Sequence, residues 1–424
     1  MSPPLPIGLL PDTAVVGDDG SLSVGGCSLT ELAGTYGTPL FVYDEEHLRN
    51  RCREAVAAFG HERVFYATKA FLCRAMARVA FEEGLLLDVA TGGELHVSMS
   101  AGVPASSCTF HGNNKSVEEL RMAINAGVRH IVVDSFDEMD RLDALRADGP
   151  APQVLLRITP GVHAHTHEFI ATGQDDSKFG FNLGNGDALR AVERARRSSS
   201  MELVGLHCHI GSNVFAATNF GKAAEVMANF AVPLDLPELV LGGGLGVAYT
   251  IGEEAPTITQ WGSVLLDACA ALGVRSKIGV EPGRAIVAAA AVTLYSVGTI
   301  KHIPGVRTYV AVDGGMSDNP RPVLYGSGYE AFLPRDVNAA RTDSVRLVGK
   351  HCESGDVLIF HAAVPPDLRV GDVLATPVTG AYGHSMGSNY NKVTRPPVVF
   401  VRDGEARLVV RRETYDDLLL TDLG

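Results

Sequence analysis

Lys69 ends an apolar and aromatic run, Val64–Phe71, in which a strand would normally bury its side chains. An ammonium group held there loses hydration, and its amine becomes available as a nucleophile or for forming a Schiff base. The alternative is a strand-end lysine whose flexible stem carries the charge to water. This segment alone leaves both interpretations open, so the neighbouring strand ends must separate them.

A glycine run, Gly242–Gly244, follows another expected strand. With no side chains in the way, its backbone N–H groups can close on a phosphate, although a tight turn would need the same glycines. Glu281 and Arg284 follow the next expected strand, and a guanidinium there would complete an anion site. An internal pair between Glu281 and Arg284 is the alternative, but it would leave the neighbouring glycines unexplained.

His207 and His209 project from the same face of an expected strand and could bind a metal. No third ligand with suitable spacing is evident, so we predict no metal site. His209 could instead lie against an aromatic cofactor, with Ser212 donating to a phosphate. The alternating histidines of segment 163–167 are expected in a loop, as polar surface or as part of a lid.

An amine, a phosphate cradle and a carboxylate on one rim match the needs of pyridoxal phosphate. Lys69 would supply the Schiff base, and the glycine run, Ser212 and Arg284 would hold the phosphate. Glu281, facing the ring nitrogen, would keep that nitrogen protonated so that the ring can accept electrons from a carbanion. This acid favours decarboxylation, because a basic partner would suit racemisation better.

Short apolar strands alternate with longer segments rich in Ala, Leu and charge from about residue 45 to 284, which is typical of βα units. Eight strands are expected, at Arg63–Lys69, Leu85–Val89, Ser107–His111, His130–Asp134, Gln153–Ile158, Leu203–His207, Glu238–Leu241 and Lys277–Glu281. Their carboxyl ends carry polar residues, namely Lys69, Asp88, His111, Asp134, Arg157, His207 and Glu281. Eight units with such a rim predict an α/β protein with a TIM-like (β/α)8 barrel, and a doubly wound sheet is the alternative.

Beyond Arg284 the pattern changes to β-branched and aromatic runs, which predict a C-terminal all-β domain. The expected strands are Val292–Ile300, Thr308–Asp313, Val345–Val348, Val357–Phe360, Val373–Val378, Val398–Val401 and Ala406–Val410. An N-terminal strand at Pro39–Tyr43 is expected to join this domain. The predicted division is therefore 1–45 packing with the β domain, 46–284 as the barrel and 285–424 as the β domain.

The composition is that of an ordinary globular protein, with 424 residues, 46% hydrophobic residues and a net charge of −13. The acidic balance argues against nucleic-acid and anionic-membrane partners. The first residues lack a basic, apolar leader, no apolar run reaches transmembrane length, and the seven scattered cysteines fit reduced thiols. We expect a cytoplasmic protein whose cysteines mostly serve packing, with Cys352 set apart in a polar, turn-prone run.

Six ordered motifs resemble the alanine-racemase-fold, pyridoxal-phosphate-dependent amino-acid decarboxylases, and among them the diaminopimelate decarboxylases. The motifs are Tyr66–Ala70, His207–Ser212, Gly242–Gly246, Glu281–Arg284, Cys352–Asp356 and Gly380–Tyr382, and the resemblance spans about Pro39 to Leu418. It implies a homodimer in which each active site is completed by the partner's Cys-Glu segment. It also implies the last step of lysine biosynthesis, the decarboxylation of meso-2,6-diaminopimelate at its D-centre to L-lysine and CO2.

The resemblance implies a role for each motif residue. It makes Lys69 the Schiff-base lysine, His209 the residue stacked on the ring, Glu281 the partner of the ring nitrogen and Cys352 the proton donor that follows loss of CO2. The cofactor-binding residues that it implies are Lys69, Asp88, Arg157, His209, Ser212, Gly243, Gly244, Glu281, Pro282, Gly283, Arg284 and Tyr382. The substrate-binding residues that it implies are Arg284, Arg321, Tyr325, Glu353 and Tyr382.

The charges of these residues bear on the substrate. Arg321 and Arg284 can bind a distal carboxylate and Glu353 a distal ammonium, so a remote amino-acid end satisfies all three. Ornithine or lysine would leave Arg321 unmatched. Asn213 and Phe71 depart from the family pattern and leave room for another amino-acid substrate. A non-catalytic relative is the third hypothesis, but such a protein would be expected to lose its chemical residues.

Overall fold

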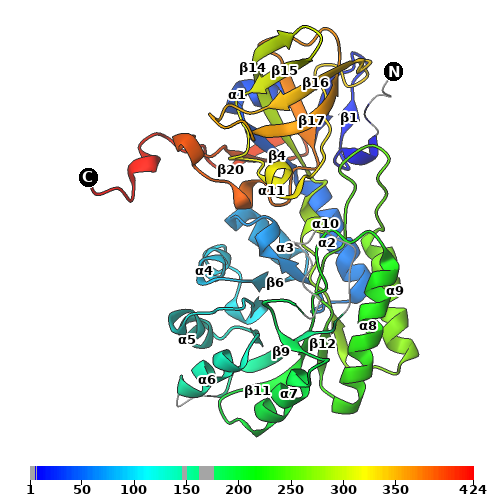
Figure 1. Ribbon diagram of the computed structural model, residues 1–424, viewed down its shortest axis with the longest axis vertical. Helices are drawn as coiled ribbons and strands as arrows, with labels where there is room; N and C mark the ends of the chain where they lie inside the picture. Colours follow the sequence, from blue (N-terminus) through cyan, green and yellow to red (C-terminus); the bar gives the residue numbers. More distant parts are fainter. Residues whose placement is uncertain (1–4, 6, 146–149, 162–175) are drawn as a thin grey trace. The chain divides into compact units, whose positions relative to one another are not determined.

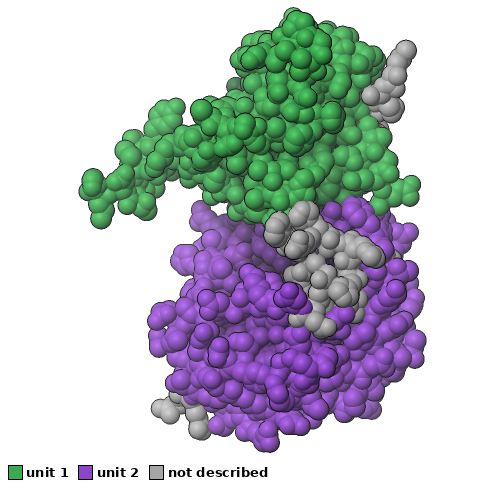
Figure 2. Space-filling model, in the orientation of Figure 1, with its two compact units in different colours: residues 1–50, 247–254, 286–424 green, residues 51–246, 255–285 purple. Residues whose placement is uncertain are grey.

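The computed structural model describes residues 5, 7–145, 150–161 and 176–424. The chain forms two compact units, shown in different colours in Figure 2. Unit 1 comprises residues 1–50, 247–254 and 286–424, and unit 2 comprises residues 51–246 and 255–285. Residues 247–254, which fall within the span expected for the barrel, group with unit 1. The histidines of segment 163–167 lie outside the described residues.

Unit 2 is built on a ring of parallel strands (Figure 1). They are β5 (Phe65–Ala67), β6 (Leu86–Val89), β7 (Cys108–Phe110), β8 (His130–Val133), β9 (Gln153–Thr159), β11 (Glu202–His207), β12 (Glu238–Val240) and β13 (Lys277–Gly279). Neighbours pair in the order β13-β12-β11-β9-β8-β7-β6-β5, and a parallel bridge between Val64 and Val280 joins the two ends. The predicted (β/α)8 barrel is thus confirmed, and the doubly wound alternative is wrong because an open sheet has no closing pair.

One strand of unit 2 was not predicted. β10 (Phe181–Asn182) pairs in parallel with the end of β9, where Phe181 faces Ile158 and Asn182 faces Thr159. Two residues carry too little periodicity to mark a strand in the sequence.

Helices surround the barrel strands on the outside (Figure 1). They are α2 (Glu45–Phe59), α3 (Arg74–Glu82), α4 (Gly92–Ser100), α5 (Val117–Ala126), α6 (Phe136–Ala144), α7 (Asp187–Arg197), α8 (Ala217–Ala231) and α9 (Ile258–Ala271). Capping boxes start two of them, with Ser116 and Glu119 at α5 and Thr257 and Gln260 at α9. Inward-facing apolar side chains then hold the helices to the strands.

An apolar cluster of buried residues draws on six of the barrel strands. Its members are Phe65, Leu86, Val132, Leu155, Val204 and Val240. Each belongs to one of the barrel strands, and the polar residues of the rim stand at or just after the carboxyl ends of those strands. The barrel thereby separates a packed core from a rim where polar groups gather.

Unit 1 is mostly strands. Its main sheet runs β17-β16-β15-β14-β4-β19-β20, with β18 paired to β14. The strands are β4 (Leu40–Asp44), β14 (Ala291–Ile303), β15 (Arg307–Val312), β16 (Asp343–Val348), β17 (Val357–Val364), β18 (Val373–Pro377), β19 (Val398–Arg402) and β20 (Glu405–Val410). The N-terminal β4 pairs antiparallel with β14 and parallel with β19, so the expected N-terminal strand lies within this sheet.

Smaller elements complete unit 1. A three-stranded sheet is formed by β1 (Val15–Val16), β2 (Leu22–Val24) and β3 (Cys27–Ser28), and the short helices are α1 (Leu29–Tyr36), α10 (Arg284–Val287), which straddles the boundary with unit 2, and α11 (Arg321–Tyr325). Within the described part of the chain, none of the helices combines the length and apolar character needed to cross a membrane.

Candidate active site

Lys69 lies in a 3-10 turn, η2 (Thr68–Ala70), directly after β5. Thr68 and Ala70 are buried, whereas Lys69 is exposed. Of the two interpretations left open for Lys69, the exposed strand-end lysine matches the structure, and the dehydrated one does not. The strand stops at Ala67, and in the tight turn Lys69 is accessible at the carboxyl end of the strand, where its charge acts on Asp88 and His209.

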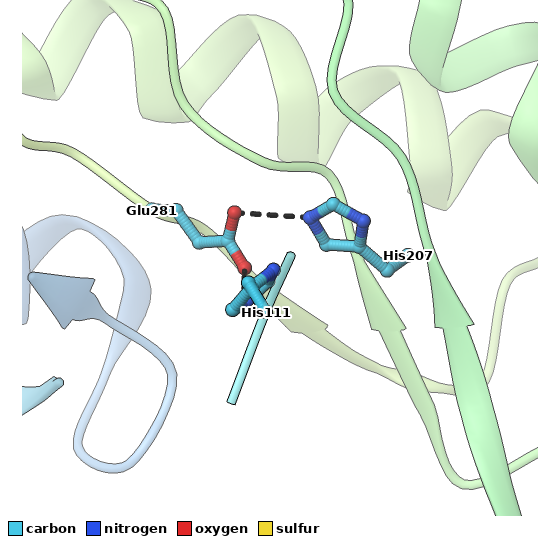
Figure 3. A group of neighbouring side chains, drawn as sticks. All are labelled: His111, His207 and Glu281. Carbon is cyan, nitrogen blue, oxygen red and sulfur yellow. Dashed lines mark hydrogen bonds and ion pairs between the residues drawn. The ribbon is translucent and has the colours of Figure 1, made fainter. Parts of the chain in front are cut away.

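Glu281 follows β13 and is held between two histidines (Figure 3). His207, the last residue of β11, places Nε2 3.0 Å from Oε2 of Glu281. His111, which follows β7, places Nε2 3.2 Å from Oε1 of the same carboxylate and 3.6 Å from Oδ1 of Asp88. All four side chains are buried, so these contacts form in a region of low dielectric.

The ionisation of this cluster follows from its contacts. Burial alone would raise the pKa of Glu281, but the imidazoles of His207 and His111 outweigh it and hold the pKa well below its usual range. Burial lowers the pKa of His207 to about 4. Burial would also lower the pKa of His111, but the carboxylates of Asp88 and Glu281 raise it above its ordinary value. Glu281 is therefore charged and His207 neutral, while the two carboxylates favour the charged form of His111.

Two further residues of the predicted rim lie in the same electrostatic neighbourhood. Burial raises the pKa of Asp88, at the end of β6, to about 6. Arg157, in β9, places Nη1 3.6 Å from Oδ2 of Asp134 and stacks its guanidinium 4.1 Å from the centre of the Phe179 ring. Asp134 also accepts a hydrogen bond from the backbone N–H of Gly180. Arg157 is thus fixed before any ligand arrives.

His209 is half-buried just beyond β11. Its Nδ1 accepts a hydrogen bond of 3.2 Å from the backbone N–H of Gly243. Burial and the charge of Lys69 hold the pKa of His209 well below its usual range, so the ring is neutral and its proton lies on Nε2. A neutral ring in a fixed orientation suits contact with an aromatic cofactor.

His209 is not part of the group of side chains that could hold a metal. Among the described residues, that group is His111, His207 and Glu281, whose ligand atoms lie within 4.8 Å of one another. The sequence pairing of His207 with His209 as metal ligands therefore has no support in the geometry, because His209 instead faces the glycine run.

The glycine run packs against backbone atoms of the adjoining strands. A Cβ on Gly243 would lie 2.0 Å from the carbonyl oxygen of Glu281, and one on Gly244, whose φ is +106°, would lie 2.1 Å from that of Gly211. Nearby, Nη2 of Arg284 donates to Oγ of Ser212 at 2.9 Å. Glycine is required here for close approach of the backbone, and a guanidinium and a hydroxyl lie together after the adjacent strands.

The positions and contacts of these residues fit the binding of pyridoxal phosphate. Oε1 of Glu281 is buried and faces Nε2 of His111 at 3.2 Å, and its second lone pair can accept a hydrogen bond from a protonated ring nitrogen. Arg284, Ser212 and the glycine run would hold the phosphate, while Pro282 and the closely packed Gly283 carry the chain between Glu281 and Arg284. An accessible amine, a buried acceptor and an anion cradle therefore all lie in unit 2.

Arg321, in α11 of unit 1, is 3% exposed. Its guanidinium stacks 4.2 Å from the centre of the Tyr249 ring, and its Nη1 donates to the hydroxyl of Tyr329. Among the described residues no carboxylate lies within ion-pair distance of Arg321, and its buried Nε has no hydrogen-bond partner. Arg321 is thus a buried cation surrounded by aromatic groups.

The remaining predicted residues of unit 1 are partly or fully exposed. Tyr325 and Tyr382 are half-buried, and Cys352 and Glu353 are exposed. The backbone N–H of Cys352 donates to Oδ1 of Asn391 at 3.1 Å. Cys352 is exposed, whereas Cys108 and Cys208 are buried like packing thiols, and burial raises the pKa of each of these two thiols to about 12.

Sequence reasoning placed His111 and His207 on the rim but assigned neither to Glu281. It missed Tyr249 and Tyr329 beside Arg321, and it missed the buried pair of Lys115 and Glu138. Lys115 stands in the polar run that follows His111, which was a usable signal. Tyr249 is far from Arg321 in the sequence, and Tyr329 is near it but belongs to no recognisable motif. Only the fold shows that both rings contact Arg321.

Comparison with known proteins identifies the family of the chain. The family model for the pyridoxal binding domain of pyridoxal-dependent decarboxylases matches residues 45–288. Diaminopimelate decarboxylase of Mycobacterium tuberculosis (strain ATCC 25618 / H37Rv) is 49% identical over 421 residues, covering 94% of each chain. That of Bacillus subtilis (strain 168) is 47% identical over 420 residues, covering 95% of each chain.

A solved structure gives the same result. Diaminopimelate decarboxylase from M. jannaschii, solved in a co-complex with L-lysine, superposes with a TM-score of 0.89 at 32% identity, covering 97% of this chain and 98% of that chain. The resemblance predicted from the six motifs is confirmed along nearly the whole chain. The chain therefore belongs to the pyridoxal-phosphate-dependent decarboxylases, in the family of the diaminopimelate decarboxylases.

Proposed function

We propose that the protein removes CO2 from the D-centre of meso-2,6-diaminopimelate and releases L-lysine, as the last step of lysine biosynthesis. The observation that carries the choice of substrate is Arg321, a buried guanidinium with no carboxylate partner among the described residues. A buried charge is costly unless it is paired, so a ligand carboxylate is the natural partner.

The substrate has two amino-acid ends, and only one reacts. The remote end carries a carboxylate and an ammonium, which we assign to Arg321 and to Glu353 respectively. Tyr325, Tyr382 and Arg284 are assigned to the same substrate. Ornithine and lysine offer the remote ammonium but no carboxylate, so they would leave Arg321 unpaired. The M. jannaschii relative was solved with L-lysine, which is the expected product here.

The residues of unit 2 supply binding and orientation. When bound, pyridoxal phosphate accepts the electrons released as the bond to the departing carboxyl group breaks. Lys69 holds the cofactor covalently, and His209 contacts its ring. Charged Glu281 keeps a proton on the ring nitrogen, which is what makes the ring an electron acceptor. Asp88 and Arg157 orient Lys69 and the ring oxygen.

A proton must replace the lost CO2 on carbon, and we assign its donation to the thiol of Cys352. We further propose that the protein is a homodimer in which the partner subunit's Cys352 and Glu353 complete each site. The barrel of residues 46–284 would bind the cofactor, and the β domain of 285–424, with segment 1–45, would present the substrate-binding residues. A cytoplasmic location would keep the Cys352 thiol reduced.

A substrate panel with CO2 release as the readout tests this function. Protein loaded with pyridoxal phosphate should show the visible absorbance of the bound cofactor and release CO2 from meso-diaminopimelate. It should turn over L-ornithine and L-lysine at least about 100-fold less efficiently, since each leaves a buried charge unpaired. Cofactor binding with an inert diaminopimelate and turnover of another amino acid would support the second candidate, a decarboxylase of different specificity. Cofactor binding with no turnover at all would point to a non-catalytic relative.

A further inference from the structure

The two oxygens of Glu281 are held differently, although one histidine faces each of them. Oε2 makes a hydrogen bond of 3.0 Å with Nε2 of His207. Oε1 lies 3.2 Å from Nε2 of His111, a contact that is longer and less well aligned than the one His207 makes. His207 therefore gives the well-aligned hydrogen bond, and His111 faces the other oxygen, which keeps a second lone pair for a ligand (Figure 3).

The protonation of His207 can be read from its second nitrogen. Nδ1 of His207 is buried and has no hydrogen-bond partner among the described residues. A neutral ring with its proton on Nε2 leaves only a lone pair at Nδ1, whereas a charged ring would bury an N–H without an acceptor. His207 is thus a neutral donor to Oε2, in agreement with the lowering of its pKa to about 4 by burial.

His111 lies between two carboxylates. Its Nε2 is 3.2 Å from Glu281 and 3.6 Å from Asp88, and its ring meets that of His207 edge to face, with centres 5.0 Å apart. A cation there offsets the repulsion that two buried carboxylates would otherwise exert on each other. The other titratable groups that interact with Glu281 are Asp88, Arg157, Cys208 and His209.

We propose that His207 and His111 are positioning residues for Glu281: His207 fixes Oε2, His111 stands between Glu281 and Asp88, and Oε1 keeps a lone pair to accept the proton-bearing ring nitrogen of pyridoxal phosphate. This inference rests on the cofactor and deepens the proposed function, but it does not depend on the identity of the substrate. Neither histidine touches the reacting atoms in this proposal, because both act through Glu281.

The test measures cofactor binding and the visible spectrum of the bound cofactor between pH 6 and 9, without substrate. His207→Leu removes the donor and should weaken pyridoxal phosphate binding about 10- to 100-fold, the usual loss for one hydrogen bond to a charged group. It should also lower the pH at which the spectrum changes, because the ring nitrogen loses its proton more easily. His207→Gln retains a donor and should stay within about threefold of the parent protein.

His111→Gln removes a positive neighbour of Glu281, so the ring nitrogen should hold its proton more tightly and the pH at which the spectrum changes should rise. His130→Gln is the matched control, since His130 is also buried but starts β8 and lies 3.7 Å from Glu238, with no contact to Glu281 among the described residues. That control should leave both readouts unchanged. If His207→Leu does not fold, His207→Asn replaces it, because the shorter amide cannot reach Oε2.

A double-variant comparison distinguishes positioning from a general structural role. In a Glu281→Gln background, His207→Leu should change cofactor affinity less than about threefold, because the carboxylate through which His207 acts is already absent. An equal loss in both backgrounds, or wild-type spectra and affinity in both His207→Leu and His111→Gln, would overturn the proposal. Protein that binds the cofactor normally but does not decarboxylate diaminopimelate would refute the proposed function and leave this inference standing.

Discussion

Nζ of Lys115 and Oε1 of Glu138 lie 2.7 Å apart inside the barrel unit, with side chains only 1% and 2% exposed. Lys115 also donates to the carbonyl oxygens of Gly112 and Val132, and Oε2 of Glu138 accepts from the backbone N–H of Asp134. The pair therefore ties together the chain that leaves β7 after His111 and the chain that leaves β8. Both segments carry residues of the rim.

We expect Lys115→Met to lower the free energy of unfolding by about 3–5 kcal/mol, because Glu138 would be left as an unpaired buried charge. Adding Glu138→Gln should recover part of the loss. Urea unfolding of the cofactor-loaded protein measures both effects. A single variant that costs less than about 1 kcal/mol would mean that water reaches the pair. Arg190→Met, at an exposed pair with Asp187, serves as the low-cost control.

The strands of the barrel could be predicted because each is a short apolar run bounded by polar or turn-forming residues. β6 and β8, for example, agree with expectation to within one residue at each end. The environment of Lys69 could not be predicted in this way. Its neighbours are apolar along the chain, but a 3-10 turn after Ala67 alternates burial residue by residue, and the sequence run does not reveal that turn.

The site could be predicted as a set of residues on one rim, but not as a set of contacts. That Glu281 follows a barrel strand is visible in the sequence, whereas the choice of His207 and His111 as its neighbours depends on strand order and register. Tyr249 is a similar case, since it lies between barrel segments in the sequence yet stacks on Arg321 in unit 1.

Gly243 is required by the approach of two backbones. Gly243→Ala would place a methyl group 2.0 Å from the carbonyl oxygen of Glu281, so the strand ends must separate. We expect a loss of about 1–3 kcal/mol in unfolding free energy and weaker binding of pyridoxal phosphate. Gly184→Ala, where no atom lies within 4 Å of the new Cβ, is the control. Unchanged cofactor affinity in Gly243→Ala would show that the strand ends tolerate the shift.

Asp318 predicts a pH dependence of stability in unit 1. Burial raises the pKa of Asp318 to about 7, although Tyr295 donates a hydrogen bond of 2.5 Å to its Oδ2. A carboxyl group whose pKa is higher in the folded than in the unfolded state contributes its full stability below the unfolded pKa of about 3.9. This contribution is lost as the pH rises through the folded pKa of about 7. Asp318→Asn should therefore gain stability relative to the parent protein between pH 5 and pH 8.

The expected relative gain is at least about 1.4 kcal/mol, the energy of one pKa unit. Thermal unfolding at pH 5, 6, 7 and 8 measures it. Asp416→Asn, at an exposed position, should run parallel to the parent protein at every pH. A constant difference between Asp318→Asn and the parent across this range would contradict the assignment.

Replacing Arg321 should lower activity without lowering the stability of the fold. Arg321→Met removes a buried cation that has no carboxylate partner among the described residues, so unfolding free energy should stay the same or rise. The kcat/KM for meso-diaminopimelate should fall about 30- to 1000-fold, because the substrate carboxylate loses its partner. Arg341→Met is the contrasting control, since Arg341 is equally buried but lies 3.0 Å from Glu330. It should cost about 3–5 kcal/mol in stability.

Cys352 is exposed on a loop that Asp356 holds through the backbone N–H groups of Met316 and His351. If its thiol protonates the carbon that has lost CO2, Cys352→Ala should lower kcat at least about 100-fold, the usual scale of a positioned proton donor. Pyridoxal phosphate affinity should change less than about twofold, because the thiol does not hold the cofactor. Equal loss of activity and cofactor affinity would instead indicate a defect in assembly.

Mixing two inactive variants tests whether the partner subunit's Cys352 completes each site. Lys69→Ala and Cys352→Ala homodimers are both expected to be inactive. Random exchange of subunits would make mixed dimers in which one site has both residues intact, which restores up to about one quarter of the parent activity. As a control, Cys352→Ala protein taken through the same exchange with itself should regain no activity. If the Lys69→Ala and Cys352→Ala pair also restores none after subunit exchange has been verified by mass, each chain must use its own Cys352.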